Sequence, residues 1–232
     1  LQVRAAKRLV ELTPGADKKV FFSNSGAESV EAAVKIAFRS RPLRAIGMAF
    51  LGSFHGRTLG ALSHTSSKTV HKKFYPVLAN AVHLPYAYCY RCPYRMSFQD
   101  CNLYCVDIIE ELYFEKLADP STVNHILTEP IQGEGGYIVP PDGFFQRLQK
   151  LCRESDILLI DDEVQAGMGR TGKIDRMAKG IAAGIPLGAT ILPRELDLEQ
   201  GAHSNTFGGN ALALNVMLKQ FEVIENEKLV EN

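Results

Sequence analysis

The chain has 232 residues, of which 46% are hydrophobic and 22% charged, a composition typical of a globular protein with a sizeable core. Lysine plus arginine and aspartate plus glutamate both number 26, so the zero formal net charge gives no reason to expect nucleic acid as a partner. No apolar run approaches the roughly 20 residues of a membrane-spanning helix, and no signal peptide is recognised. We therefore expect a cytoplasmic protein with no membrane partner.

Strands and helices alternate along the chain. The predicted elements are helix 3–12, strand 19–23, helix 27–38, strand 46–51, helix 106–116, strand 126–128, helix 144–154, strand 156–161 and helix 211–226. The strand at 156–161 has the clearest pattern of a buried strand. Such alternation predicts an α/β fold around a mostly parallel sheet, in which ligands bind beyond the carboxyl ends of the strands.

Two strand ends carry small or aromatic residues. Ser25, Gly26 and Ala27 open a helix, where free N–H groups and the helix dipole suit a phosphate, although taken alone the motif is better explained as a plain helix cap. Phe54 and His55 stand between two glycines, where an aromatic side chain can stack on a planar ring. The alternative for Phe54 is a turn with a buried side chain.

Two further strand ends carry acids. Glu129 and Glu134 lie in a glycine-rich stretch that forms either a pocket or a solvated loop. Asp161, Asp162 and Glu163 follow an apolar run, and carboxylates there need a cationic partner. We assign no metal ligand, because no histidine or further acid is near in sequence, and a protonated ring nitrogen is a better match.

Lys179 stands alone in a run of small and apolar residues. Desolvation disfavours a charged amine and makes it nucleophilic, as Schiff-base chemistry requires, although a surface lysine is the alternative. The stretch 204–210 offers hydroxyls for a second phosphate contact. Pyridoxal phosphate needs a turn that binds its phosphate, an aromatic side chain that stacks on its ring, an acid that pairs with its ring nitrogen and an isolated lysine, and the sequence offers all four.

Six motifs occur in the order typical of one family. They are Ser25-Gly26-Ala27-Glu28, Phe54-His55-Gly56-Arg57-Thr58, Glu129-Pro130-Ile131-Gln132-Gly133-Glu134-Gly135-Gly136, Asp162-Glu163-Val164-Gln165, Lys179-Gly180 and Thr206-Phe207-Gly208-Gly209-Asn210. With them the chain resembles the class III pyridoxal-phosphate aminotransferases of fold type I, and the 4-aminobutyrate aminotransferase branch in particular, from about Arg4 to Asn226. The resemblance implies the three-layer α/β/α large domain of these enzymes, with a mostly parallel sheet.

The resemblance also implies residue roles. Lys179 would carry the cofactor as a Schiff base and move a proton between the substrate Cα and the cofactor C4′. Asp162 would pair with the ring nitrogen. The other implied cofactor contacts are Val164 and Phe54 on the two ring faces, Gln165 at the ring hydroxyl, and Ser25, Gly26 and Ala27 at the phosphate.

Thr206 would reach the phosphate of a neighbouring subunit, which implies a homodimer or a larger homo-oligomer. Glu134 would pair with an arginine that binds the substrate carboxylate. Residues 1–232 would form the cofactor domain, with the N-terminal segment and the C-terminal small domain absent. The spacing between Lys173 and Lys179 is shorter than in the family, so we expect a missing segment near 173–174.

The expected reaction is ping-pong transfer of an amino group from an ω-amino acid, such as 4-aminobutyrate or an ornithine-type donor, to the keto acid 2-oxoglutarate. One alternative is an amino-acid racemase on the same scaffold, and a second is a cofactor-free structural fragment. The motifs alone do not separate these alternatives.

Cys89, Cys92, Cys101 and Cys105 form a C-x2-C-x8-C-x3-C pattern, and Cys152 stands apart. The four clustered cysteines are compatible with a zinc site, two disulfides or free thiols. Their spacing is not one of the strong zinc patterns, and the three alternatives stay open.

Overall fold

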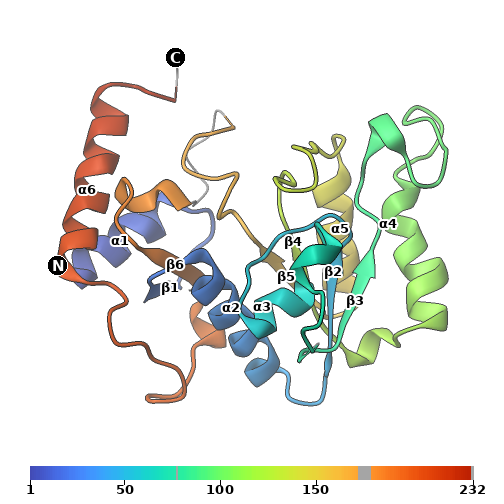
Figure 1. The fold of residues 1–232 in the computed structure, drawn as a ribbon, viewed down its shortest axis with the longest axis horizontal. Coiled ribbons are helices and arrows are strands. Elements are labelled where there is room, and N and C mark those ends of the chain that lie inside the picture. The colour runs from blue at the N-terminus through green and yellow to red at the C-terminus, as the bar shows by residue number, and fades with distance from the viewer. Residues whose placement is uncertain (77, 172–178, 231–232) are drawn as a thin grey trace. The chain divides into compact units, whose positions relative to one another are not determined.

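The computed structural model describes residues 1–76, 78–171 and 179–230, without the side chain of Lys179 (Figure 1). By its internal contacts the chain divides into unit 1, made of Leu1–Ile36 and Glu163–Asn232, and unit 2, made of Ala37–Asp162. The helices are α1 Gln2–Leu12, α2 Gly26–Ser40, α3 Leu59–His64, α4 Tyr104–Ile108, α5 Phe144–Glu154 and α6 Ala211–Asn226. The strands are β1 Lys18–Ser23, β2 Ile46–Phe50, β3 Ala81–Leu84, β4 Val123–Thr128, β5 Leu158–Asp161 and β6 Gly188–Pro193.

Unit 2 contains a parallel sheet of four strands in the order β3-β2-β4-β5. β4 is buried along its whole length and β2 along all but its first residue, which explains the apolar sequence of β2 without polar alternation. Because the strands are parallel, the residues that follow β2, β4 and β5 come together at one edge of this sheet. The predicted mixed α/β fold with a parallel sheet is confirmed.

The strand over 156–161, which has the clearest buried pattern in the sequence, is shorter and less buried than expected. β5 begins only at Leu158 and is an outer strand of the sheet in unit 2. Its residues 158–160 are half-buried and Asp161 is exposed. An outer strand has less of its surface covered, and its apolar sequence alone does not reveal that position in the sheet.

The core of unit 2 lies between this sheet and α5. The buried positions of α5 are Phe144, Leu148, Leu151 and Cys152, spaced as one face of an amphipathic helix. Phe144 packs edge-on against Phe50 of β2, with ring centroids 6.0 Å apart, and against Tyr86 at 5.6 Å. Such aromatic packing fixes the sheet whose edge carries the candidate site residues.

Unit 1 is built on β1 and β6, which pair antiparallel from Lys18–Pro193 to Ser23–Gly188. Helices α1 and α6 lie side by side, as the blue and red helices of Figure 1 show. Leu9, Ile181, Leu214 and Phe221 are buried in their common core. Among the helices that the structure describes, none has the length and apolar character needed to cross a membrane.

The other predicted elements are present within a few residues of the predicted bounds, with one difference. The helix expected over 106–116 begins earlier as α4 and continues as a π-helical turn over Ile109–Phe114. Three short elements were not predicted: α3, β3 and β6.

Candidate functional site

Asp162 directly follows β5 in unit 2 and is only 7% exposed. Its Oδ2 lies 2.7 Å from Nδ1 of His55, whose side chain is completely buried. The backbone N–H of Asp162 donates to the carbonyl of Thr128, which joins it to the end of β4. A buried carboxylate needs a polar or charged partner, and the imidazole of His55 is such a partner for Asp162.

His55 is the residue that sequence reasoning undervalued, because it stands 107 positions before Asp162 and its neighbours give no signal of the contact. Its Nε2 is buried and has no hydrogen-bond partner within the described structure. The imidazole is held through Nδ1 alone, so its hydrogen bond fixes the orientation of the Asp162 carboxylate.

Glu129 links two loops of unit 2. Its Oε1 accepts the N–H of Phe54 and its Oε2 accepts the N–H of Gly133, both at 2.9 Å. Burial raises the pKa of this carboxyl, and the two N–H donors act in the opposite direction. The side chain of Glu129 thus joins the loop after β2 to the loop after β4. Because Glu129 is buried, its surroundings are not a solvated loop.

The half-buried ring of Phe54 is covered in part by its own loop. The guanidinium carbon of Arg57 lies 5.0 Å from the ring centroid, and the ring of His71 meets it edge-on at 5.5 Å. The ring of Phe54 therefore contacts the guanidinium of Arg57 and the imidazole of His71, and its backbone N–H donates to Glu129.

Glu134 is exposed and forms an ion pair with Lys68, whose Nζ lies 3.5 Å from Oε2. An exposed position agrees with the solvated-loop alternative for this residue. Lys68 was not singled out by the sequence, because nothing near it distinguishes it from other surface lysines.

In unit 1, Ser25 caps α2. Its Oγ accepts the N–H of Glu28 at 3.2 Å, and Oε2 of Glu28 accepts the backbone N–H of Asn24 at 2.8 Å. The helix-cap alternative is thus part of the structure. The first-turn N–H groups of Gly26 and Ala27 have no acceptor within a helix, so the same turn can also bind a phosphate.

Gly26 makes a close approach to Val164 within unit 1. A Cβ added at Gly26 would lie 2.6 Å from Cγ1 of Val164, far inside normal contact. The structure therefore brings a predicted phosphate residue and a predicted ring-face residue together. Only glycine, which has no side chain, can lie this close to Val164.

The structure gives the positions of the other predicted site residues, Gln165, Thr206 and Lys179. Gln165 is half-buried beside Val164, and Thr206 is exposed in the loop before α6. Lys179 begins a short 3-10 turn, Lys179–Ala182, but its side chain is not described. The missing segment expected near 173–174 lies outside the described residues.

A buried pair of histidines in unit 2 was not predicted. The Nε2 atoms of His64 and His125 lie 3.1 Å apart, so one ring donates to the other. Burial lowers the pKa of His64 to about 4 and that of His125 to about 3. Both rings are therefore neutral at pH 7, and their hydrogen bond is part of the polar core.

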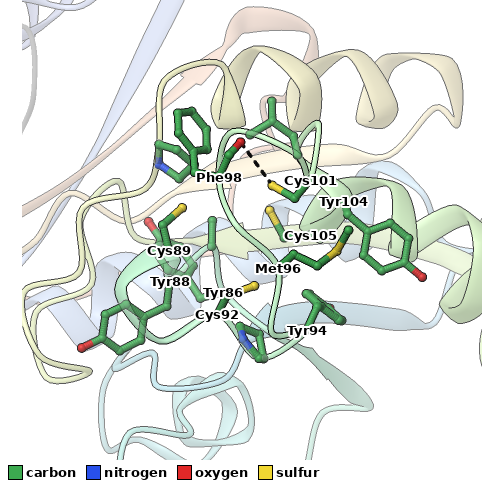
Figure 2. Close-up of a pocket in the computed structure, with 14 residues that line it drawn as sticks. Tyr86, Tyr88, Cys89, Cys92, Tyr94, Met96, Phe98, Cys101, Tyr104 and Cys105 are labelled. Carbon is green, nitrogen blue, oxygen red and sulfur yellow. Dashed lines mark hydrogen bonds between the residues drawn. The ribbon is translucent and has the colours of Figure 1, made fainter.

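The five cysteines are all free thiols, which is one of the three alternatives. Four of them line a single cavity (Figure 2). In the described part of the chain, no group of three or more His, Cys, Asp or Glu side chains is arranged to hold a metal ion.

The whole chain, residues 1–232, matches the family of class-III aminotransferases, and the chain belongs to this family. It is 39% identical, over 244 residues, to an acetylornithine aminotransferase of Methanopyrus kandleri, a match that covers 99% of this chain and 57% of the relative.

Solved structures agree with this family. An (S)-enantioselective omega-transaminase from Thermomicrobium roseum has a TM-score of 0.90 and 30% identity, over 99% of this chain and 56% of that one. An amine transaminase from an uncultivated Pseudomonas species, solved in a pyridoxal-phosphate-bound form, has a TM-score of 0.88 and 29% identity, over 99% and 58%. The chain thus spans a little more than half the length of these relatives.

Proposed function

We propose that this chain is the cofactor domain of a pyridoxal-phosphate-dependent aminotransferase. Membership of the class-III family and the six ordered motifs support the proposal. The observation that carries it is the buried carboxylate of Asp162 at the end of a parallel strand, oriented by His55. The close contact of Gly26 with Val164 also supports the proposal, because it brings the start of α2, which suits a phosphate, next to the residue proposed for one ring face.

When bound, pyridoxal phosphate supplies an electron sink for the carbon that loses its proton. Lys179 would attach the cofactor covalently, and its Nζ would move the proton between the substrate Cα and the cofactor C4′. Asp162 would keep the ring nitrogen protonated, with His55 holding the carboxylate in place. The helix start at Ser25, Gly26 and Ala27 would bind the phosphate.

Val164 and Phe54 would pack on the ring faces, Gln165 would reach the ring hydroxyl, and Thr206 would bind a phosphate of a second subunit. Glu134 would pair with the arginine for the substrate carboxylate, exchanging its ion pair with Lys68. A homodimer and a cytoplasmic location stay predictions, as do the bounds 1–232 of the cofactor domain. The match over 244 residues exceeds the 232 of this chain, which supports a missing segment.

For the donor we propose an ω-amino acid, with 2-oxoglutarate as acceptor. The acetylornithine aminotransferase of Methanopyrus kandleri favours an ornithine-type donor over 4-aminobutyrate. The full protein would be given each donor with pyridoxal phosphate, with and without 2-oxoglutarate, and glutamate would be measured. We expect glutamate to form only when both the amino donor and 2-oxoglutarate are present.

Interconversion of the enantiomers of an amino acid without any keto acid would establish the racemase instead. Failure of the full protein to bind pyridoxal phosphate would establish the structural alternative. Asp162→Asn is expected to lower turnover by about a hundredfold, the scale for one lost electrostatic contact in an active site. The matched variant Asp161→Asn changes an exposed neighbour and should retain activity.

A further inference from the structure

The segment 85–103, which joins β3 to α4, is long for a connection within a domain. It contains the short turn Cys89–Arg91, and its backbone hydrogen bonds, such as Arg95 N–H to Cys92 O and Cys101 N–H to Ser97 O, are local. Arg95 and Leu103 have φ of +57° and +61°, in the left-handed region. Such strain persists only where the surroundings fix the backbone, so the side chains that pack this segment determine its conformation.

Four cysteine side chains, three in this segment and one at the start of α4, line the same cavity. They are Cys89, Cys92, Cys101 and Cys105. Figure 2 shows them around this cavity among tyrosines, Met96 and Phe98. The cavity has a volume of about 20 Å³, and roughly 10–15 Å³ on this measure admits one water molecule. There is room for one body the size of a water molecule or a metal ion.

The thiols interact with one another electrostatically. Burial raises the pKa of Cys105 to about 12 and also raises that of Cys89, and the neighbouring thiols add to both effects. A divalent cation deprotonates the thiols that coordinate it, whatever their pKa in its absence.

We propose that Cys89, Cys92, Cys101 and Cys105 bind one zinc ion as a four-thiolate structural site. Zinc is chosen because it is the divalent ion that prefers four thiolates in a tetrahedral arrangement. Binding breaks four S–H bonds and forms four Zn–S bonds, and four protons go to solvent. The site would carry a charge of minus two, and the same segment contains two arginines, Arg91 and Arg95.

The sulfurs must turn inward, because as they stand in the described structure no three potential ligands are arranged to hold a metal ion. A change between staggered χ1 rotamers moves a sulfur by roughly 3 Å, and the proposal requires such rotations to gather the four sulfurs around the ion. The zinc ion would then join the start of the segment to its end. The site does not depend on the proposed aminotransferase function.

The test uses the full reduced protein, incubated with zinc sulfate and desalted, with zinc measured per chain. One zinc per chain is expected for the wild type. The same is expected for Cys152→Ser, a matched control, because Cys152 is buried in α5 and does not line the cavity. Cys101→Ser should lose most of the zinc. Equal retention by Cys101→Ser, or no zinc in the wild type, overturns the proposal.

A second measurement needs no variant. Cobalt(II) added to the wild type should give the sulfur-to-metal charge-transfer band of tetrahedral thiolate coordination, and zinc should remove it. Absence of that band overturns the proposal, as does mass analysis that finds disulfides among the four cysteines of the native protein. Neither readout depends on bound pyridoxal phosphate.

Discussion

Gly26→Ala tests the close approach on which the proposed phosphate turn depends. The added Cβ would lie 2.6 Å from Cγ1 and 3.1 Å from Cγ2 of Val164. Carbon atoms normally stay 3.5–4.0 Å apart, so something must move by roughly 1 Å. Val164 has little freedom, because a β-branched side chain is stiff about χ1. Such overpacking costs about 1–3 kcal/mol of unfolding free energy.

In the proposed site the same shift moves the first-turn N–H groups of α2 away from the phosphate. Losing one charge-assisted hydrogen bond costs about 1.5–3 kcal/mol, which corresponds to a Kd for pyridoxal phosphate that is weaker by about 10- to 150-fold. The assays are urea unfolding of the cofactor-free protein and a pyridoxal phosphate titration. Val164→Ala removes the clashing atoms, so Gly26→Ala should cost less in that background, by about 1 kcal/mol or more. Unchanged stability and affinity in Gly26→Ala would refute the reasoning.

Three further predictions concern unit 2. The pKa of His64 is about 4 in the folded protein and 6.5 in the unfolded chain, so the unfolded chain binds a proton more readily. The contribution of His64 to the free energy of unfolding is therefore complete above pH 6.5 and falls by roughly 3 kcal/mol toward pH 4. Urea midpoints across that range should show it, and a flat profile would count against it. Gly47→Ala places a Cβ 2.7 Å from Nε2 of both His64 and His125 and should cost about 1–3 kcal/mol; an unchanged urea midpoint would show that the rings give way. Glu129→Ala leaves two buried N–H groups without their acceptor and should cost about 2–4 kcal/mol, with Glu129→Gln losing less; equal losses in urea unfolding would contradict this.

The sequence predicts the longer elements because their signals are local. The α5 helix repeats its apolar residues at helical spacing, and its bounds agree with the prediction. β3, by contrast, is four residues long and has no such repeat. The outer position of β5 depends on strand order, which no window of sequence contains.

The candidate site shows the same division. The residues after each strand could be chosen from sequence, because ligands bind at strand ends. The partners of those residues could not. His55 meets Asp162 from 107 positions away, and Glu129 is buried because two loops supply N–H donors to it. Such pairings come from the fold.

The attachment of pyridoxal phosphate to Lys179 is the central claim. The full protein would be incubated with pyridoxal phosphate, reduced with borohydride, digested, and its peptides analysed by mass spectrometry. The account predicts one stoichiometric pyridoxyl group, on Lys179, and none in Lys179→Ala. A label on another lysine at the same stoichiometry, or an equal label in Lys179→Ala, would contradict it.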